Sequence, residues 1–219
     1  MLAVLAGAFD LEPDHAFEER ERVVVVRPAD LSVRGWSWEA HAPGRACLVL
    51  PGHGEVPASA LDGVLTRLHR VTPRDLGHMD AEDREYVADE MTAFLAALLA
   101  TLPVPVINAP SAASLCGPAW THHHWMRAAD AAGLTVCPHP AAGEHDQVAV
   151  LDGAVVGGAD GTSTAPRAEA ARTLQGVAGV RLLSVGFCHC HPDGVTGASP
   201  LPALTPAVGE AILTRFAAG

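Results

Sequence analysis

The chain has 219 residues, of which 49% are hydrophobic and 18% charged, with a formal net charge of -11 at pH 7. This composition predicts a well-buried globular protein and excludes a disordered chain. The acidic balance excludes a nucleic-acid partner, because polyanion binding requires clustered basic residues. All the cations are arginine, so a Walker-type lysine motif for phosphate is excluded as well.

The first ten residues are apolar, but they have no basic leader and run directly into acidic sequence. They therefore predict a first strand rather than a signal peptide. No apolar run approaches the roughly 20 residues that span a bilayer, so we expect no membrane partner. We expect a cytoplasmic protein whose five cysteines are reduced or bound to metal rather than paired in disulfides.

Apolar runs alternate with helical patterns along the chain, which predicts an α/β fold with a largely parallel sheet. Strands are expected at Leu2–Leu5, Val23–Val26, Ala46–Leu50, Pro105–Ile107, Leu134–Cys137, Gln147–Leu151, Ala154–Gly157 and Leu182–Phe187. Helices are expected from the acidic stretch at 80–83 up to Pro103, from Thr121 to Gly133, and over Val208–Phe216.

The sequence changes in character near residues 138–144, where a stretch rich in Pro and Ala precedes a hairpin that turns at Asp152-Gly153. We therefore expect two lobes, residues 1–140 and 141–219. The first is a lobe with a parallel α/β sheet, and the second is a smaller α+β lobe.

Three segments resemble ATP-grasp proteins of the RimK-like kind. Residues 83–90 lead into the long helix, residues 105–110 read Pro-Val-Ile-Asn-Ala-Pro, and residues 125–138 form a helix, a glycine, a strand and a proline. Residues 147–187 are similar to the later part of an ATP-grasp domain. The resemblance implies a pre-ATP-grasp-like lobe over 1–140 and a truncated ATP-grasp-like lobe over 141–219.

The chain departs from that family in the parts that bind nucleotide. The linker before His145 is too short for the central nucleotide-binding subdomain, and lysine is absent. Where the family's magnesium ligands would fall, the chain reads Phe187-Cys188-His189-Cys190-His191. Thiolate and imidazole suit copper, iron or zinc rather than magnesium, so we expect a transition metal and no ATP.

Two short clusters hold the predicted metal ligands. In an extended strand Cys188 and Cys190 share one side while His189 and His191 share the other, unless a turn at 192–194 brings His191 back. His122, His123 and His124 begin a helix, where at most two can converge on one ion. The alternatives are core or solvent side chains in the first cluster and a solvated helix start in the second.

Substrate binding is predicted at three further side chains. His53 follows a strand end between glycines, where open α/β sheets place ligand-binding groups, although it can equally be a turn residue. Arg67 and Arg84 can bind a carboxylate, or can form ordinary ion pairs. No Gly-x-Ser-x-Gly segment is present, so Ser-His-Asp hydrolysis is disfavoured.

These features favour a metalloenzyme that uses a Cys/His centre, in a cleft between the lobes, on a small-molecule or peptide substrate in natural-product biosynthesis. We favour redox over hydrolytic chemistry, because no carboxylate stands beside the clusters as a general base. The alternative is a catalytically silent ATP-grasp-like protein that binds a peptide or partner, with a structural metal or none. A true ATP-dependent ligase would bind nucleotide. The sequence leaves open the oligomeric state, the catalytic residues and whether the two clusters share one site.

Overall fold

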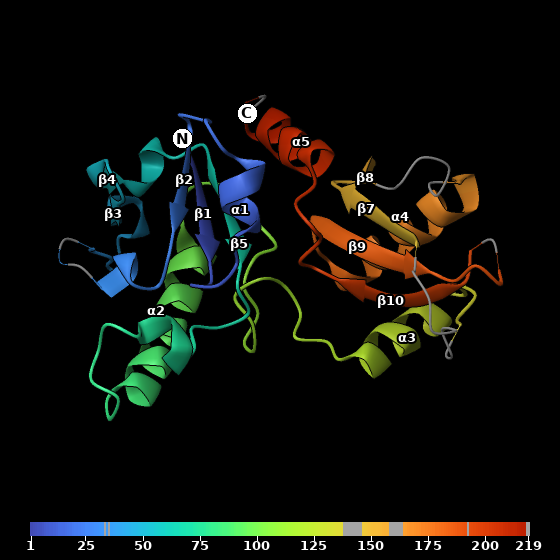
Figure 1. Ribbon diagram of the computed structural model, residues 1–219, viewed down its shortest axis with the longest axis horizontal. Helices are drawn as coiled ribbons and strands as arrows, with labels where there is room; N and C mark the ends of the chain where they lie inside the picture. Colours follow the sequence, from blue (N-terminus) through green and yellow to red (C-terminus); the bar gives the residue numbers. More distant parts are fainter. Residues whose placement is uncertain (33, 35, 138–145, 158–163, 192, 218–219) are drawn as a thin grey trace. The chain divides into compact units, whose positions relative to one another are not determined.

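The structure is a computed structural model that describes residues 1–32, 34, 36–137, 146–157, 164–191 and 193–217. The chain divides into two compact units, Met1–Gly117 with Leu213–Gly219, and Pro118–Ile212. Figure 1 labels most of their helices and strands. The predicted lobe boundary at residue 140 falls in 138–145, outside the described residues, and stays a prediction.

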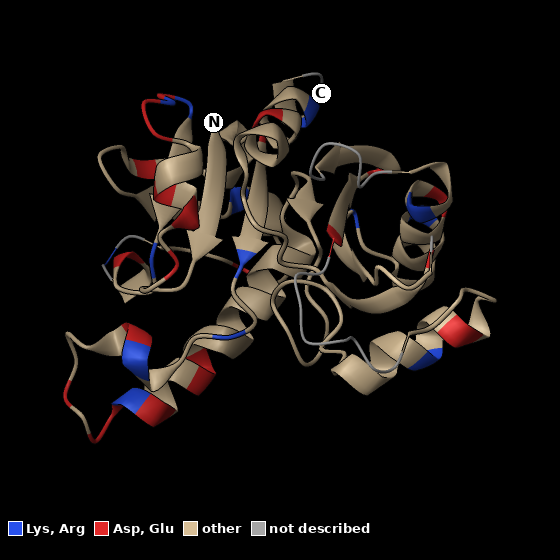
Figure 2. Ribbon diagram, turned by 45° about the vertical axis from the view of Figure 1, so that its right-hand side comes forward, with Lys and Arg blue, Asp and Glu red and all other residues tan. Residues whose placement is uncertain are grey.

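The first unit is built on a four-stranded sheet with every neighbouring pair parallel. Its strand order is β2-β1-β5-β6, comprising Val23–Val26, Leu2–Ala6, Gly63–Arg67 and Val106–Ile107. All residues of β1 and β5 are buried, which explains why β1 reads as an uninterrupted apolar run. Neither β1 nor β2 carries a charged residue (Figure 2).

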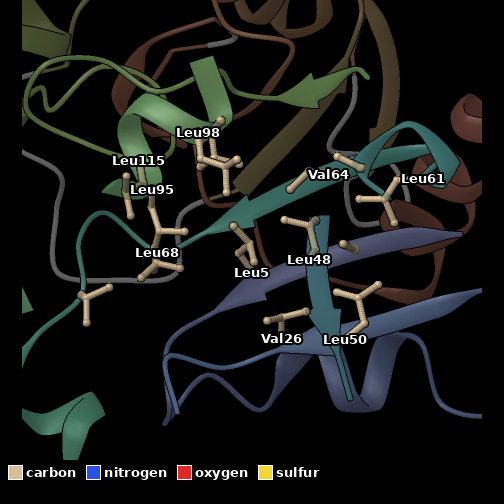
Figure 3. Close-up of a cluster of buried hydrophobic side chains, with 14 of the residues drawn as sticks. Leu5, Val26, Leu48, Leu50, Leu61, Val64, Leu68, Leu95, Leu98 and Leu115 are labelled. Atoms are coloured by element: carbon tan, nitrogen blue, oxygen red, sulfur yellow. The ribbon is translucent and has the colours of Figure 1, made fainter. Parts of the chain in front are cut away.

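A long helix covers the apolar core of this unit. Helix α2 runs from Arg84 to Thr101, and its buried residues Ala88, Leu95, Leu98 and Leu99 recur at helical spacing. They pack in one cluster with side chains of the sheet and the surrounding loops (Figure 3), among them Leu5, Val26, Leu48, Leu50, Leu61, Val64, Leu68 and Leu115. The unit also contains α1 (Glu12–Ala16) and the hairpin of β3 (Cys47–Leu50) and β4 (Gly54–Pro57).

The second unit is built on an antiparallel sheet with the order β10-β9-β7-β8. Its strands are Val195–Ser199, Leu182–Phe187, Asp146–Leu151 and Ala154–Gly157. Helices α3 (His122–Ala131) and α4 (Ala165–Ala178) contribute side chains to the same apolar cluster as β7 and β9. The chain is thus a mixed α/β protein with a four-stranded parallel sheet, a four-stranded antiparallel sheet and the β3–β4 hairpin, and the predicted fold class is confirmed.

Some predicted elements differ from those observed. Residues 134–137, expected to be a strand, form only an isolated bridge between Val136 and Val195. Strands β4, β5 and β10 and helix α1 lack a prediction, and α4 lacks a predicted residue range. Thr66 and Arg67 interrupt the apolar pattern of β5, and Gly197 interrupts that of β10. Helix α5 runs from Pro206 to Ala217, slightly longer than expected. No helix in the described part of the chain is both long enough and apolar enough to cross a membrane.

The end of α5 packs closely on β5 in the first unit, and this contact predicts the effect of one substitution. A Cβ atom on Gly63 would lie 2.0 Å from a ring carbon of Phe216, which is only 8% exposed. We expect Gly63→Ala to lower the free energy of unfolding by about 1–3 kcal/mol through overpacking, measured by urea denaturation.

The matched control is Gly44→Ala, because a Cβ atom there meets nothing within 4 Å. In a Phe216→Ala background the cost of Gly63→Ala should disappear. Equal losses from Gly44→Ala and Gly63→Ala would contradict the proposed contact.

Candidate functional site

The Cys/His run lies in the loop that joins β9 to β10. Strand β9 ends at Phe187, and the loop closes where the Cys188 N–H donates to the Gly194 carbonyl at 2.8 Å. Gly194 is needed because a Cβ atom there would lie 2.6 Å from the Cys188 Sγ atom. The tight turn expected at 192–194 explains this geometry in part, although Pro192 itself lies outside the described residues.

A third cysteine joins this loop from a distant part of the chain. The Val195 N–H donates to the Thr135 carbonyl and the Cys137 N–H to the Val195 carbonyl, each at 2.8 Å. The Sγ atom of Cys190 lies 3.0 Å from that of Cys188 and 3.4 Å from that of Cys137. The three sulfur atoms all lie within 4.8 Å of one another, and none is in a disulfide.

The three thiols stand in unequal electrostatic environments. Burial acts to raise the pKa of Cys188. Hydrogen bonds from the Cys190 and Cys137 thiols and backbone contacts at His191 and Cys190 act in the opposite direction and outweigh burial, so the pKa of Cys188 is lowered. Hydrogen bonds to Cys190 and Cys188 are the main cause that raises the pKa of Cys137 to about 12. The contacts among the thiols therefore make Cys188 easier to ionise and Cys137 harder to ionise.

A buried arginine holds the strand ends beside the cluster. Arg167 in α4 donates to the Asp146 carboxylate at 2.6 Å and to the Cys188 carbonyl at 3.1 Å, and its guanidinium lies over the Phe187 ring. The same carboxylate lies 3.5 Å from Nδ1 of the exposed His189. A carboxylate therefore does stand beside the cluster, which is contrary to the expectation drawn from the sequence.

The predicted histidine ligands do not join the cysteines. His124 forms the capping contact at the start of α3, with its Nδ1 3.1 Å from the Thr121 Oγ1, and the rings of His122 and His123 pack edge to face. His191 is exposed in the loop. Within the described residues, Cys137, Cys188 and Cys190 form the one group of three ligand atoms close enough to hold an ion. A role for the histidines in metal binding stays a prediction.

The predicted substrate-binding residues have local structural contacts, all in the first unit. His53 is exposed in the β3–β4 turn, with Nδ1 2.9 Å from the Pro51 carbonyl. Arg67 is buried at the end of β5 and pairs with Asp10 and Glu12 at 2.8 and 3.0 Å. Arg84 donates to the carbonyls of Gly77 and Met79, closing the loop before α2. Substrate binding by any of the three stays a prediction.

In the first unit, the Cys116 thiol lies in a group of a different kind, with a histidine and a serine. The His69 Nδ1 lies 3.0 Å from the Ser114 Oγ and 3.2 Å from the Cys116 Sγ. Burial raises the pKa of Cys116 and lowers that of His69, so both are neutral near pH 7. The contacts tie the loop after β6 to the segment after β5.

Solved structures of similar fold belong to ATP-grasp ligases. The ligase PsnB complexed with minimal precursor, Mg and ADP matches with a TM-score of 0.69 and 12% identity, over 98% of this chain and 97% of that one. The macrocyclase MdnC with precursor peptide MdnA, from Microcystis aeruginosa, matches at 0.61 and 9%, over 98% and 100%. A Chryseobacterium gregarium RiPP-associated ligase with ADP and a leader and core peptide matches at 0.60 and 9%, over 98% and 96%.

No family model and no curated protein matches the sequence. At these identities the structural matches show the fold alone, and the chain has an ATP-grasp-like fold. The coarser part of the sequence resemblance is thereby confirmed.

The expectation that ATP is not a cofactor is contradicted by these structures. They include complexes with ADP and with AMPPNP, and two of them also contain magnesium. The expectation depended on the absence of lysine and on the short linker. Lysine is not required for phosphate binding, because arginine side chains, backbone N–H groups at helix N-termini and Mg²⁺ also bind phosphate.

Sequence reasoning missed Cys137, Asp146 and Arg167. Cys137 falls in a predicted strand, and nothing in its neighbourhood marks it as a ligand. Asp146 begins β7, and Arg167 lies in a helix for which no residue range was predicted. The only available signal was the position of Asp146 and Cys137 at the ends of apolar runs, where strand ends gather polar groups.

Arg167 and Asp146 form an ion pair whose loss should destabilise the second unit. Their side chains are 9% and 21% exposed. Arg167→Met leaves the carboxylate and the Cys188 carbonyl without their donor, so we expect a loss of about 2–4 kcal/mol in urea unfolding.

Arg172 is the matched control in the same helix, because its pair with Glu169 is exposed, at 3.5 Å. Arg172→Met should cost no more than about 1 kcal/mol. Asp146→Asn should recover part of the loss in the Arg167→Met background. Similar costs for the two arginines would contradict the importance of the buried pair.

The cysteines should differ in reactivity. Cys190 is exposed, whereas Cys116 is 0% exposed with a pKa raised by burial. In metal-free reduced protein at neutral pH we expect iodoacetamide to label Cys190 at least ~10-fold faster than Cys116, as measured by peptide mass spectrometry. In denaturant the two rates should converge, and equal rates in the native protein would disprove the assignment.

Proposed function

We propose that the protein modifies a peptide in natural-product biosynthesis. The observation that carries this proposal is the fold match, which extends over 98–99% of the chain to ligases solved with precursor peptides. The proposed substrate is a ribosomally made precursor peptide, and a free small molecule is the less favoured of the two substrate classes considered. Since identity is 9–12% in these matches, the proposal depends on fold and not on matched residues.

We infer that this modification uses ATP with magnesium, as the similar ligases were solved with nucleotide. The source of the phosphate contacts in this chain would be its arginines and its backbone N–H groups. Its fourteen basic residues are all arginine, whose planar guanidinium group binds phosphate in a bidentate manner.

We further infer that the second unit contributes a transition-metal centre. Its support is the convergence of three thiols at one end of the β9–β10 hairpin, an arrangement that suits a soft metal. A metal there would supply either Lewis-acid or redox chemistry to the peptide reaction. The Asp146 carboxylate near His189 removes one reason for preferring redox chemistry, because a candidate general base is now present.

A second candidate function fits the low identity of the matches, 9–12%, over which no nucleotide-binding residue is carried to this chain. A catalytically silent protein of this fold would bind the peptide without turning over nucleotide, and any metal would be structural. The two candidates predict different results with nucleotide and peptide.

Calorimetry with AMPPNP and MgCl2 tests the nucleotide step. We expect binding with Kd in the micromolar range, equivalent to about -8 kcal/mol, and its loss when EDTA removes magnesium. Heat of binding that is unchanged by EDTA would contradict a magnesium-dependent site. Absence of binding would contradict the use of ATP and would support the catalytically silent candidate.

Co-expression with a candidate precursor peptide tests the modification. Each bond formed by condensation should lower the peptide mass by one water, and purified protein should reproduce the change only with ATP. An unmodified peptide that still binds in calorimetry would support the silent candidate instead.

A further inference from the structure

The three cysteines of the second unit come together although nothing covalent joins them. Cys137 is 53 residues away from Cys190 in sequence, yet their sulfur atoms lie 3.4 Å apart. Thiols form only weak hydrogen bonds, so mutual S–H contacts are a poor reason to gather three of them. Bound metal and disulfide formation are the two strong interactions open to such a group.

The sulfur positions match those of a thiolate metal site. With Zn–S bonds of about 2.3 Å, a tetrahedral site separates its sulfur atoms by about 3.8 Å. The two observed contacts, 3.0 and 3.4 Å, are shorter than that value, and all three sulfur atoms lie within 4.8 Å of one another. Small side-chain rotations therefore suffice to place all three around one ion.

The backbone holds the ligands independently of any ion. Cys188 is fixed by its bond to Gly194, and Cys137 by its bond to Val195, both at 2.8 Å. Cys137 and Cys188 are 8% and 4% exposed, while Cys190 closes the site on the solvent side. Arg167 donates to the Cys188 carbonyl and places a positive charge near the thiolates.

We propose that Cys137, Cys188 and Cys190 together bind one Zn²⁺ ion through three thiolates. The proposal names the ligands of the metal centre inferred above and rests on that part of the proposed function. It replaces the mixed Cys/His set expected from the sequence with sulfur ligands alone. In the described part of the chain, no fourth ligand atom lies with the three sulfur atoms. The fourth tetrahedral position is therefore left to a ligand other than these three cysteines.

Binding should be visible without peptide or nucleotide. Protein purified without a histidine tag and under reducing conditions should contain one zinc per chain by elemental analysis. Cobalt added to the demetallated protein should give sulfur-to-metal absorption, and zinc should displace it. Because neither ATP nor peptide is present, this result is separate from the success or failure of the proposed peptide modification.

Cys190→Ser is the decisive variant, because Cys190 is exposed and its replacement spares the core. We expect the zinc affinity to fall by more than the roughly 10–100-fold that loss of a supporting contact costs. Cys137→Ser should behave in the same way. Cys47→Ser, which replaces a free cysteine of the first unit, and His124→Ala should keep one zinc per chain and full cobalt absorption. Thermal unfolding of metal-free Cys190→Ser should match that of the metal-free parent.

Several results would overturn the assignment. Zinc retained at full stoichiometry in Cys190→Ser and Cys137→Ser would do so, and so would metal lost on replacing His122–His124 but not the cysteines. Copper or iron bound in place of zinc would overturn the choice of ion. If wild-type protein binds no zinc and its mass is two hydrogen atoms below that of the reduced chain, two of the cysteines form a disulfide instead.

Discussion

The second unit depends on the backbone pairing of β9 with its two neighbours. In the observed register Phe187 lies opposite both Asp146 of β7 and Val195 of β10, so three chain segments end at one level of the sheet. The bridge from Val195 to Val136 adds a fourth segment. These hydrogen bonds fix where the β9–β10 loop leaves the sheet, and the positions of the cysteines follow from them.

Charge compensation at the same level keeps this arrangement intact. Arg167 binds both the Asp146 carboxylate and the Cys188 carbonyl, so one buried cation joins α4 to the ends of β7 and β9. A buried charge is costly unless it is paired and hydrogen-bonded, and here it is both. The environment of Cys116 is different. The Cys116 thiol is buried beside a neutral imidazole, whereas the Cys188 sulfur accepts hydrogen bonds from two neighbouring thiols.

Elements with strong local patterns could be predicted from the sequence. Strands β1, β2, β7, β8 and β9 are apolar runs bounded by turns, and α2 has helical spacing of its leucines. Strand β5 was missed although it is the partner of β1 in the sheet, because Thr66 and Arg67 end it with polar residues that tertiary contacts satisfy. Strand β10 was missed because Gly197 weakens its pattern.

By itself the sequence determined the fold class, the arginine-only acidic composition and the location of a ligand-rich segment at 188–191. The alternation of an extended strand does not explain why the thiols of Cys188 and Cys190 meet, because both residues lie in the loop after β9. The tertiary structure alone decided that Cys137 completes the group and that the His122–His124 triplet does not. The periodicity of apolar residues predicts only the local conformation of a segment and the side of it on which each residue lies. Pairing between segments some 50 residues apart is decided by the packing of the whole sheet, which no local pattern records.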